Sequence, residues 1–173
     1  MGVTTSNSVV GTYQAIATYL VSGTSTTTYS FNSIPSTYTD LILVFNGLTS
    51  TNTDICLRFN SDSGNNYTST YMYGTSSTNG SSRRTTTTAL ARLLIEEAGT
   101  GTGWMNIHVS IQNYADTSIN KTVLSNSASA SNGATVIAGK WASTAAINSI
   151  TINCDSGYMV AGTNFTIYGI KAA

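Results

Sequence analysis

Two strand-like runs and the turns that bound them lie between Ile34 and Tyr67, and they constrain the fold more than any other part of the chain. Pro35 fixes its own φ and pushes Ile34 towards extended backbone. The apolar run 41–45 (LILVF) follows and ends at Asn46-Gly47, a turn dipeptide. A short apolar run between turn signals predicts a buried core strand.

The second run, residues 54–59, alternates in character. Its apolar residues Ile55, Leu57 and Phe59 share one face of a strand, while Cys56 and Arg58 share the other. One face of this strand is therefore expected to meet the core and the other to be exposed.

Composition extends the β interpretation to the whole chain. Ser, Thr, Asn and Gly make up about half of the 173 residues, which suits turns and pleated strands and suits helices poorly. Ten Tyr, four Phe, two Trp and many Ile and Val distinguish the chain from a disordered one. We expect one all-β domain over residues 13–173.

Turn signals recur about every ten residues, a spacing typical of sandwiches and jelly rolls. We predict an antiparallel two-layer β-sandwich with jelly-roll connections. The expected strands are residues 13–21, 28–31, 41–45, 54–59, 67–73, 90–96, 104–112, 122–127, 135–141, 147–153 and 164–170.

Three polar stretches are predicted to be exposed connections: residues 74–88, which lack any apolar side chain, residues 99–103 and residues 125–133. Residues 89–98 (ALARLLIEEA) suit a short amphipathic helix or a strand edge about equally, and we favour the strand.

Charged residues form only 8% of the chain and cancel formally to zero. Such a chain has no basic field for nucleic acid, so we expect no nucleic-acid partner. No apolar run is long enough to cross a bilayer, and residues 1–14 lack the pattern of a secretory signal, so we expect no membrane insertion and synthesis in a cytoplasm. Low repulsion between copies is compatible with an assembly.

Candidate catalytic and metal-binding groups are few. The single histidine, His108, alternates with Ile107 and Val109 and is expected to point outwards. We predict no catalytic residue, no metal site and no cofactor, and therefore no enzyme. Cys56 and Cys154 are interpreted as small buried thiols, with a disulfide left open.

The turn 60–66 (NSDSGNN) places side-chain oxygens around a glycine but has one carboxylate, so a hairpin turn explains it better than a calcium loop. Whether an ion sits there remains open.

Two groups of residues are candidates for contact with a partner or glycan. Arg83 and Arg84 form the only basic pair and could reach an acidic sugar, a phosphate or a carboxylate. Tyr67, Tyr71 and Tyr73 share one face of a predicted strand and could stack on a sugar. Solvated arginines and core-packed rings are the alternatives.

Five segments in order along the chain resemble a family of small virion structural proteins of tailed bacteriophages, frequent among phages of marine bacteria and cyanobacteria. They are residues 29–43 (YSFNSIPSTYTDLIL), 57–67 (LRFNSDSGNNY), 111–120 (IQNYADTSIN), 139–152 (GKWASTAAINSITI) and 164–171 (NFTIYGIK). Their residues are typical of fold determinants and not of a catalytic site.

The resemblance implies a non-enzymatic β-sandwich on the virion, made in the host cytoplasm. It would act as a capsid decoration or cement protein, most simply a homotrimer bound to the major capsid protein, with residues 1–12 as a docking arm. The alternative is a tail-fibre or appendage module, bound to tail or neck proteins, that presents residues 74–88 to a host-surface glycan. A glycan hydrolase is disfavoured because no facing carboxylate pair is visible in the sequence.

Overall fold

The structure is a computed structural model that describes residues 12–23, 25–51, 53–90, 103–130 and 133–171. Within these ranges the chain forms eleven strands and no helix. The strands are β1 Tyr13–Leu20, β2 Thr28–Phe31, β3 Asp40–Gly47, β4 Ile55–Phe59, β5 Tyr67–Gly74, β6 Asn79–Thr87, β7 Met105–Gln112, β8 Lys121–Ser129, β9 Gly133–Trp141, β10 Ile150–Cys154 and β11 Asn164–Ile170.

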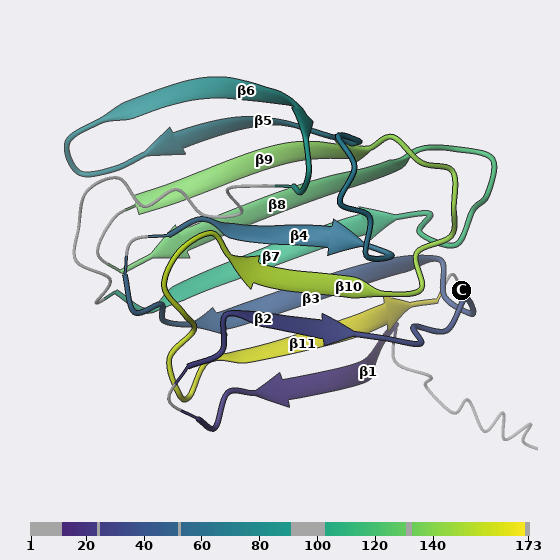
Figure 1. Ribbon diagram of the computed structural model, residues 1–173, viewed down its shortest axis with the longest axis horizontal. Coiled ribbons are helices and arrows are strands. Elements are labelled where there is room, and N and C mark those ends of the chain that lie inside the picture. The colour runs from purple at the N-terminus through teal and green to yellow at the C-terminus, as the bar shows by residue number, and fades with distance from the viewer. Residues whose placement is uncertain (1–11, 24, 52, 91–102, 131–132, 172–173) are drawn as a thin grey trace, which may run out of the picture.

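The strands form two antiparallel sheets stacked face to face (Figure 1). The larger sheet has eight strands in the order β1, β11, β3, β7, β8, β9, β5, β6, and the smaller has three in the order β2, β10, β4. The predicted all-β, two-layer antiparallel sandwich is confirmed. The jelly-roll connectivity is not confirmed, since eight of the strands lie in one layer.

Most predicted strands lie within a few residues of the observed ones, and β2 and β11 have the predicted bounds. Two predicted loops are wrong. Residues 79–87 of the expected 74–88 loop form β6, which pairs with β5 through backbone hydrogen bonds, and β8 continues to Ser129 through part of the expected 125–133 connection. An edge strand can form without apolar side chains, because the backbone hydrogen bonds to its neighbouring strand hold it in the sheet.

Some predictions fall outside the described residues. These are the arm up to residue 11, residues 91–98 of the segment expected to be a strand edge, residues 99–102 of one expected loop and residues 131–132 of another. Leu90, which begins that expected strand, forms an isolated bridge to Leu57 and is buried.

The core fills the space between the two sheets. Alternate residues of each strand point inwards, as the period of two requires: in β7, Ile107, Val109 and Ile111 are buried while His108 is exposed. On β4, Ile55, Leu57 and Phe59 face this core, which confirms the predicted face. Cys56 is buried as well, but on the opposite face of β4 against Ala89.

Aromatic side chains connect the two sheets at both edge strands of the small sheet, β2 and β4. Tyr19 of β1 stacks on Tyr29 of β2 with ring centroids 3.7 Å apart. At the other end, Phe59 of β4 lies 5.6 Å from Trp141 of β9. These contacts fix β2 over the β1 and β11 edge and β4 over β9.

Candidate functional site

The face of the large sheet that points away from the small sheet, called the outer face below, is the broadest regular surface of the described chain. Residues that pair directly across antiparallel strands project on the same side of the sheet, so the register identifies its rows. One row consists of Thr18, Thr166, Val44, His108, Asn126, Val136 and Met72. The next consists of Ala15, Tyr168, Ile42, Ser110, Leu124, Ala138 and Thr70.

These two central rows contain no Asp, Glu, Lys or Arg. Three large apolar side chains project from neighbouring strands of this region and are well exposed: Leu124 at 57%, Val136 at 43% and Met72 at 60%. Val136 pairs directly with Met72, and Leu124 lies diagonally from Val136 on the adjacent strand. Exposed apolar side chains grouped on a flat, uncharged surface are typical of a protein interface.

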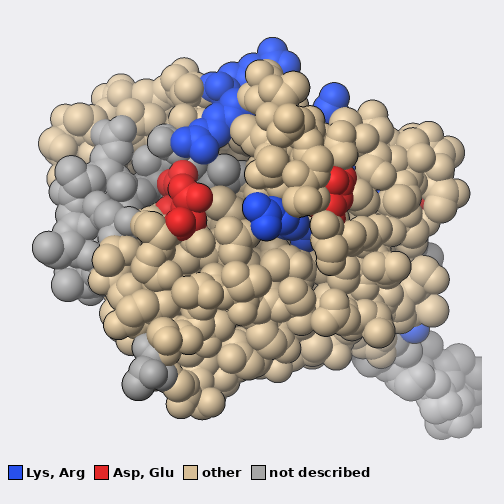
Figure 2. All heavy atoms as spheres, viewed as in Figure 1, with Lys and Arg blue, Asp and Glu red and all other residues tan. Residues whose placement is uncertain are grey.

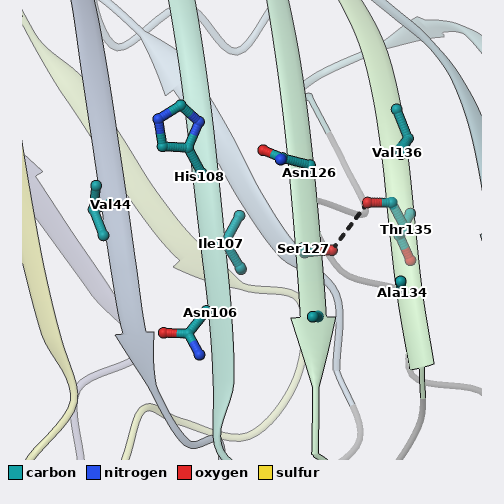
Figure 3. Close-up of a pocket in the computed structure, with 10 residues that line it drawn as sticks. Val44, Asn106, Ile107, His108, Asn126, Ser127, Ala134, Thr135 and Val136 are labelled. Atoms are coloured by element: carbon teal, nitrogen blue, oxygen red, sulfur yellow. Dashed lines mark hydrogen bonds between the residues drawn. The ribbon is translucent and has the colours of Figure 1, made fainter.

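A shallow depression of about 390 Å³ lies within the outer face (Figure 3). His108 projects into it between Val44 on β3 and Asn126 on β8, with Asn106 beside it (Figure 3). The neighbours of the imidazole are amide and aliphatic groups. The hydroxyl residues of the lining are Ser127, which is buried and whose Oγ donates to the Thr135 carbonyl, and Thr135, which is also buried. The residues that line the depression include no carboxylate that could orient the imidazole.

A second, more polar depression of about 320 Å³, called the arginine groove below, lies on the opposite side of the molecule, between the outward side of the small sheet and β6. Figure 2 shows acidic and basic atoms close together on this side of an otherwise mostly uncharged surface. The groove is lined by Cys56, Arg58, Asn65, Arg84, Thr86, Thr87, Thr88, Ala89, Asn153 and Asp155.

The two arginines of the predicted basic pair separate. Arg84 pairs with the inward-facing Ser69 and lines the arginine groove, whereas Arg83 pairs with Thr70 and lies on the outer-face side of β6. This division follows from β6 being a strand, because successive side chains of a strand point to opposite faces.

The three candidate tyrosines do share one face of β5, but that face is the inner one. Tyr67 is fully buried and Tyr71 nearly so, while Tyr73 is half-buried against the small cluster of Tyr71 and Ile137. The ring faces of Tyr67 and Tyr71 therefore cannot stack on a sugar from solvent. Both rings pack in the interior instead.

The turn 60–66 uses its oxygens internally. The Asp62 carboxylate accepts hydrogen bonds from Trp141 Nε1 at 2.6 Å, the Gly64 amide at 2.8 Å and Asn66 Nδ2 at 2.9 Å. The Trp141 bond is the main cause of a lowered pKa at Asp62. The Asn60 side-chain oxygen accepts from the backbone amide of Asn148. The predicted hairpin is wrong, because residues 60–66 connect β4 of the small sheet to β5 of the large sheet, and these two strands do not pair. The hydrogen bonds of Asp62 instead anchor this connection between the two layers.

No disulfide joins Cys56 to Cys154. Cys56 points to the outward side of the small sheet and Cys154, two positions after the buried Ile152, points to the core. Burial raises the pKa of the Cys154 thiol to about 11, so this thiol stays protonated at neutral pH and is unreactive.

In the described part of the chain, no group of three or more His, Cys, Asp or Glu side chains is placed to hold a metal ion. Nor do those residues include a helix that is long and apolar enough to span a membrane.

The sequence indicated Arg84 as a candidate contact residue, but it indicated neither surface as a whole. Leu124, Val136 and Met72 belong to three different strands, and only the strand order brings them together. The arginine groove joins β4, β6 and β10 in the same way. Comparison of the chain with protein-family models, curated proteins and solved structures finds no match in any of the three.

Proposed function

We propose that this protein is a non-enzymatic structural protein of a tailed bacteriophage particle, which attaches to a neighbouring virion subunit through its outer face. The observation that carries the proposal is the uncharged centre of the outer face, with Leu124, Val136 and Met72 exposed side by side. The resemblance of five chain segments to phage virion proteins supplies the particle as the setting.

Physical chemistry favours a protein partner for this surface. Burial of exposed apolar side chains is favourable by about 25 cal/mol for each Å² removed from water. A surface without fixed charges loses little on desolvation, and short Ala, Ser and Thr side chains let a partner approach the sheet closely. An enzyme that used His108 as a general base would be helped by a carboxylate that orients the imidazole, and no carboxylate is among the residues that line its depression.

Within the particle we favour a capsid decoration or cement role over a tail appendage. The sandwich is a single compact body with one broad contact face, which suits a subunit that covers and braces its neighbours. A homotrimer is the simplest assembly for such a subunit at a local three-fold position of a capsid.

Reconstitution onto particles that lack the protein tests the proposal. Leu124→Glu places a carboxylate in the centre of the outer face and should abolish attachment, because the charge would be buried without a partner. The matched control is Thr28→Glu, an exposed strand position on the opposite side of the sandwich, which should attach normally. Normal attachment of the Leu124→Glu protein, or absence of the wild-type protein from purified virions, would refute the proposal.

A further inference from the structure

The arginine groove has the features of a small-ligand site that the structural role does not require. Its lining combines two guanidinium groups, three threonines, two asparagine amides and one carboxylate, and its volume of about 320 Å³ is at the lower end of the range for small-molecule pockets. The walls come from β4, β6 and β10, so strands rather than loops position most of these groups.

One hydrogen bond holds the Arg58 guanidinium in place and leaves its other donor groups available. Its Nε donates to the backbone carbonyl of Thr88 at 3.0 Å, which fixes the plane of the guanidinium. Within the described residues, its two Nη groups have no hydrogen-bond partner. A fixed guanidinium with free Nη groups is a ready donor pair for a carboxylate.

Arg84 is only loosely paired. Its Nη2 lies 3.8 Å from Asp54 Oδ2, beyond hydrogen-bond distance, and its side chain is 36% exposed. An ion pair of this length and exposure contributes little to stability, so Arg84 remains able to bind a ligand.

Acceptors lie in the same groove. The Asn153 side-chain oxygen is buried and has no hydrogen-bond partner among the described residues. A buried carbonyl without a donor is unfavourable, and a ligand hydroxyl would supply that donor. The Asp155 side chain also lines the groove and offers a second acceptor for hydroxyl groups.

The charges define the ligand further. Among the residues that the structure describes, the two positive charges of Arg58 and Arg84 are matched by the two negative charges of Asp54 and Asp155 around the groove. A phosphate dianion would meet the carboxylates and is disfavoured, as is nucleic acid. A molecule with one carboxylate and several hydroxyls satisfies both the guanidinium donors and the carbonyl and carboxylate acceptors.

We propose that the arginine groove binds a carboxylate-bearing saccharide, such as a uronic acid residue of a surface glycan. The sugar carboxylate accepts from the Nη groups of Arg58, and ring hydroxyls donate to Asn153 and Asp155. This proposal goes beyond the structural role and depends on the groove alone. Because the described lining of the groove includes no aromatic ring for stacking, we expect a single sugar to bind weakly, with a Kd of about one millimolar.

Amide chemical shifts of the full chain, followed by NMR during addition of methyl glucuronide, test this proposal. The expected result is saturable shifts in β4, β6 and β10, about tenfold weaker binding for Arg58→Gln and for Arg84→Gln, and unchanged binding for Arg83→Gln. Arg83→Gln is a matched control, since it removes the same charge from the adjacent residue on the other side of the strand. The unperturbed spectrum of each variant reports whether it has folded.

Two further probes complete the design. Methyl glucoside, which lacks the carboxylate, should bind much more weakly than methyl glucuronide, and inorganic phosphate should not compete. The proposal is overturned if methyl glucuronide causes no saturable shifts in the wild-type protein, if phosphate binds the groove better, or if all three arginine variants bind alike. These measurements use the isolated protein, so they are independent of whether it attaches to a particle.

Discussion

Although this chain has few charged residues, one of them, a lysine, lies in its interior. Lys121 is fully buried at the start of β8. Its ammonium donates to the carbonyls of Asp116, Ile119 and Thr144, and so ties the turn before β8 to the segment after β9. Burial lowers the pKa of Lys121, and the nearby Asp116 partly offsets that effect.

Replacement of this ammonium is expected to be costly. Lys121→Met leaves three carbonyls without their donor, and we expect the free energy of unfolding to fall by about 3 kcal/mol. Urea denaturation measures the loss. Lys140→Met, on the exposed side of β9, is the control and should change stability by less than about 0.5 kcal/mol. Equal stability of the two variants would mean that water satisfies the three carbonyls.

Tyr67 gives a prediction about alkaline pH. Its hydroxyl accepts from the Phe59 amide at 3.0 Å and donates to the Asp62 carbonyl at 3.1 Å, and burial raises its pKa to about 12 from an ordinary value of 10.0. A raised pKa means that the folded state keeps a proton that the unfolded chain loses. The stabilisation is therefore complete below pH 10 and decreases as pH rises towards 12, by at most about 1.4 kcal/mol per pH unit.

The Tyr67→Phe variant isolates this effect. It should be about 1 to 2 kcal/mol less stable at pH 8, because two hydrogen bonds are lost, and its stability should fall less steeply above pH 10. Cys154, Tyr114 and Lys121 titrate in both proteins and cancel in the difference. Urea unfolding from pH 8 to 11.5 should show the two stability curves converging. Parallel curves would contradict the assignment of the shift to Tyr67.

At the scale of elements, the sequence predicted strands well where apolar side chains mark them. β11 and β2 have the predicted bounds, and the inward residues of β7 follow the alternation of Ile107, Val109 and Ile111. β6 was missed because the sequence NGSSRRTTT has no apolar residue, and its order comes from backbone bonds to β5 that residue type does not encode. The end of β8 was missed for a similar reason, since small Ser and Ala residues resemble a loop in sequence.

Close packing across one strand supplies a prediction at this scale. A Cβ added to Gly169 of β11 would lie 2.3 Å from the ring of Tyr38, so the ring lies flat against the glycine backbone. The Tyr38 hydroxyl also donates to Gln14 of β1 at 3.1 Å. Gly169 therefore lets one aromatic ring cover both β11 and the edge strand β1.

Gly169→Ala should displace this ring and lower stability by about 2 kcal/mol. Gly74→Ala is the matched control, because a Cβ at Gly74, also in the large sheet, would meet nothing within 4 Å and should cost little. Thermal unfolding of both variants compares the two costs. A Gly169→Ala protein as stable as the control would show that the ring moves aside freely.

At the scale of the whole molecule, the candidate surfaces depend on strand order, which the sequence did not reveal. The turn signals predicted two layers but not that eight strands would share one of them. That division creates a wide outer face on one side and places Arg58 and Arg84 together on the other. The low overall charge of the chain could be predicted from composition. The separation of the uncharged centre of the outer face from a charged groove depends on non-local strand pairing.

The two surfaces lie on opposite sides of the sandwich, and this gives a prediction about orientation that rests on the proposed structural role. If the outer face attaches to the particle, Lys140, which projects from it, should react several-fold less with an amine-specific reagent in virions than in the free protein. Arg58 and Arg84 should react equally with an arginine-specific dicarbonyl in both states, because the groove points away from the shell. Lys121 is buried in the free protein and serves as an internal reference for unfolding during labelling. Mass spectrometry of peptides from both samples measures all four residues at once. Protection of the arginines with Lys140 unchanged would reverse the orientation and assign attachment to the groove side.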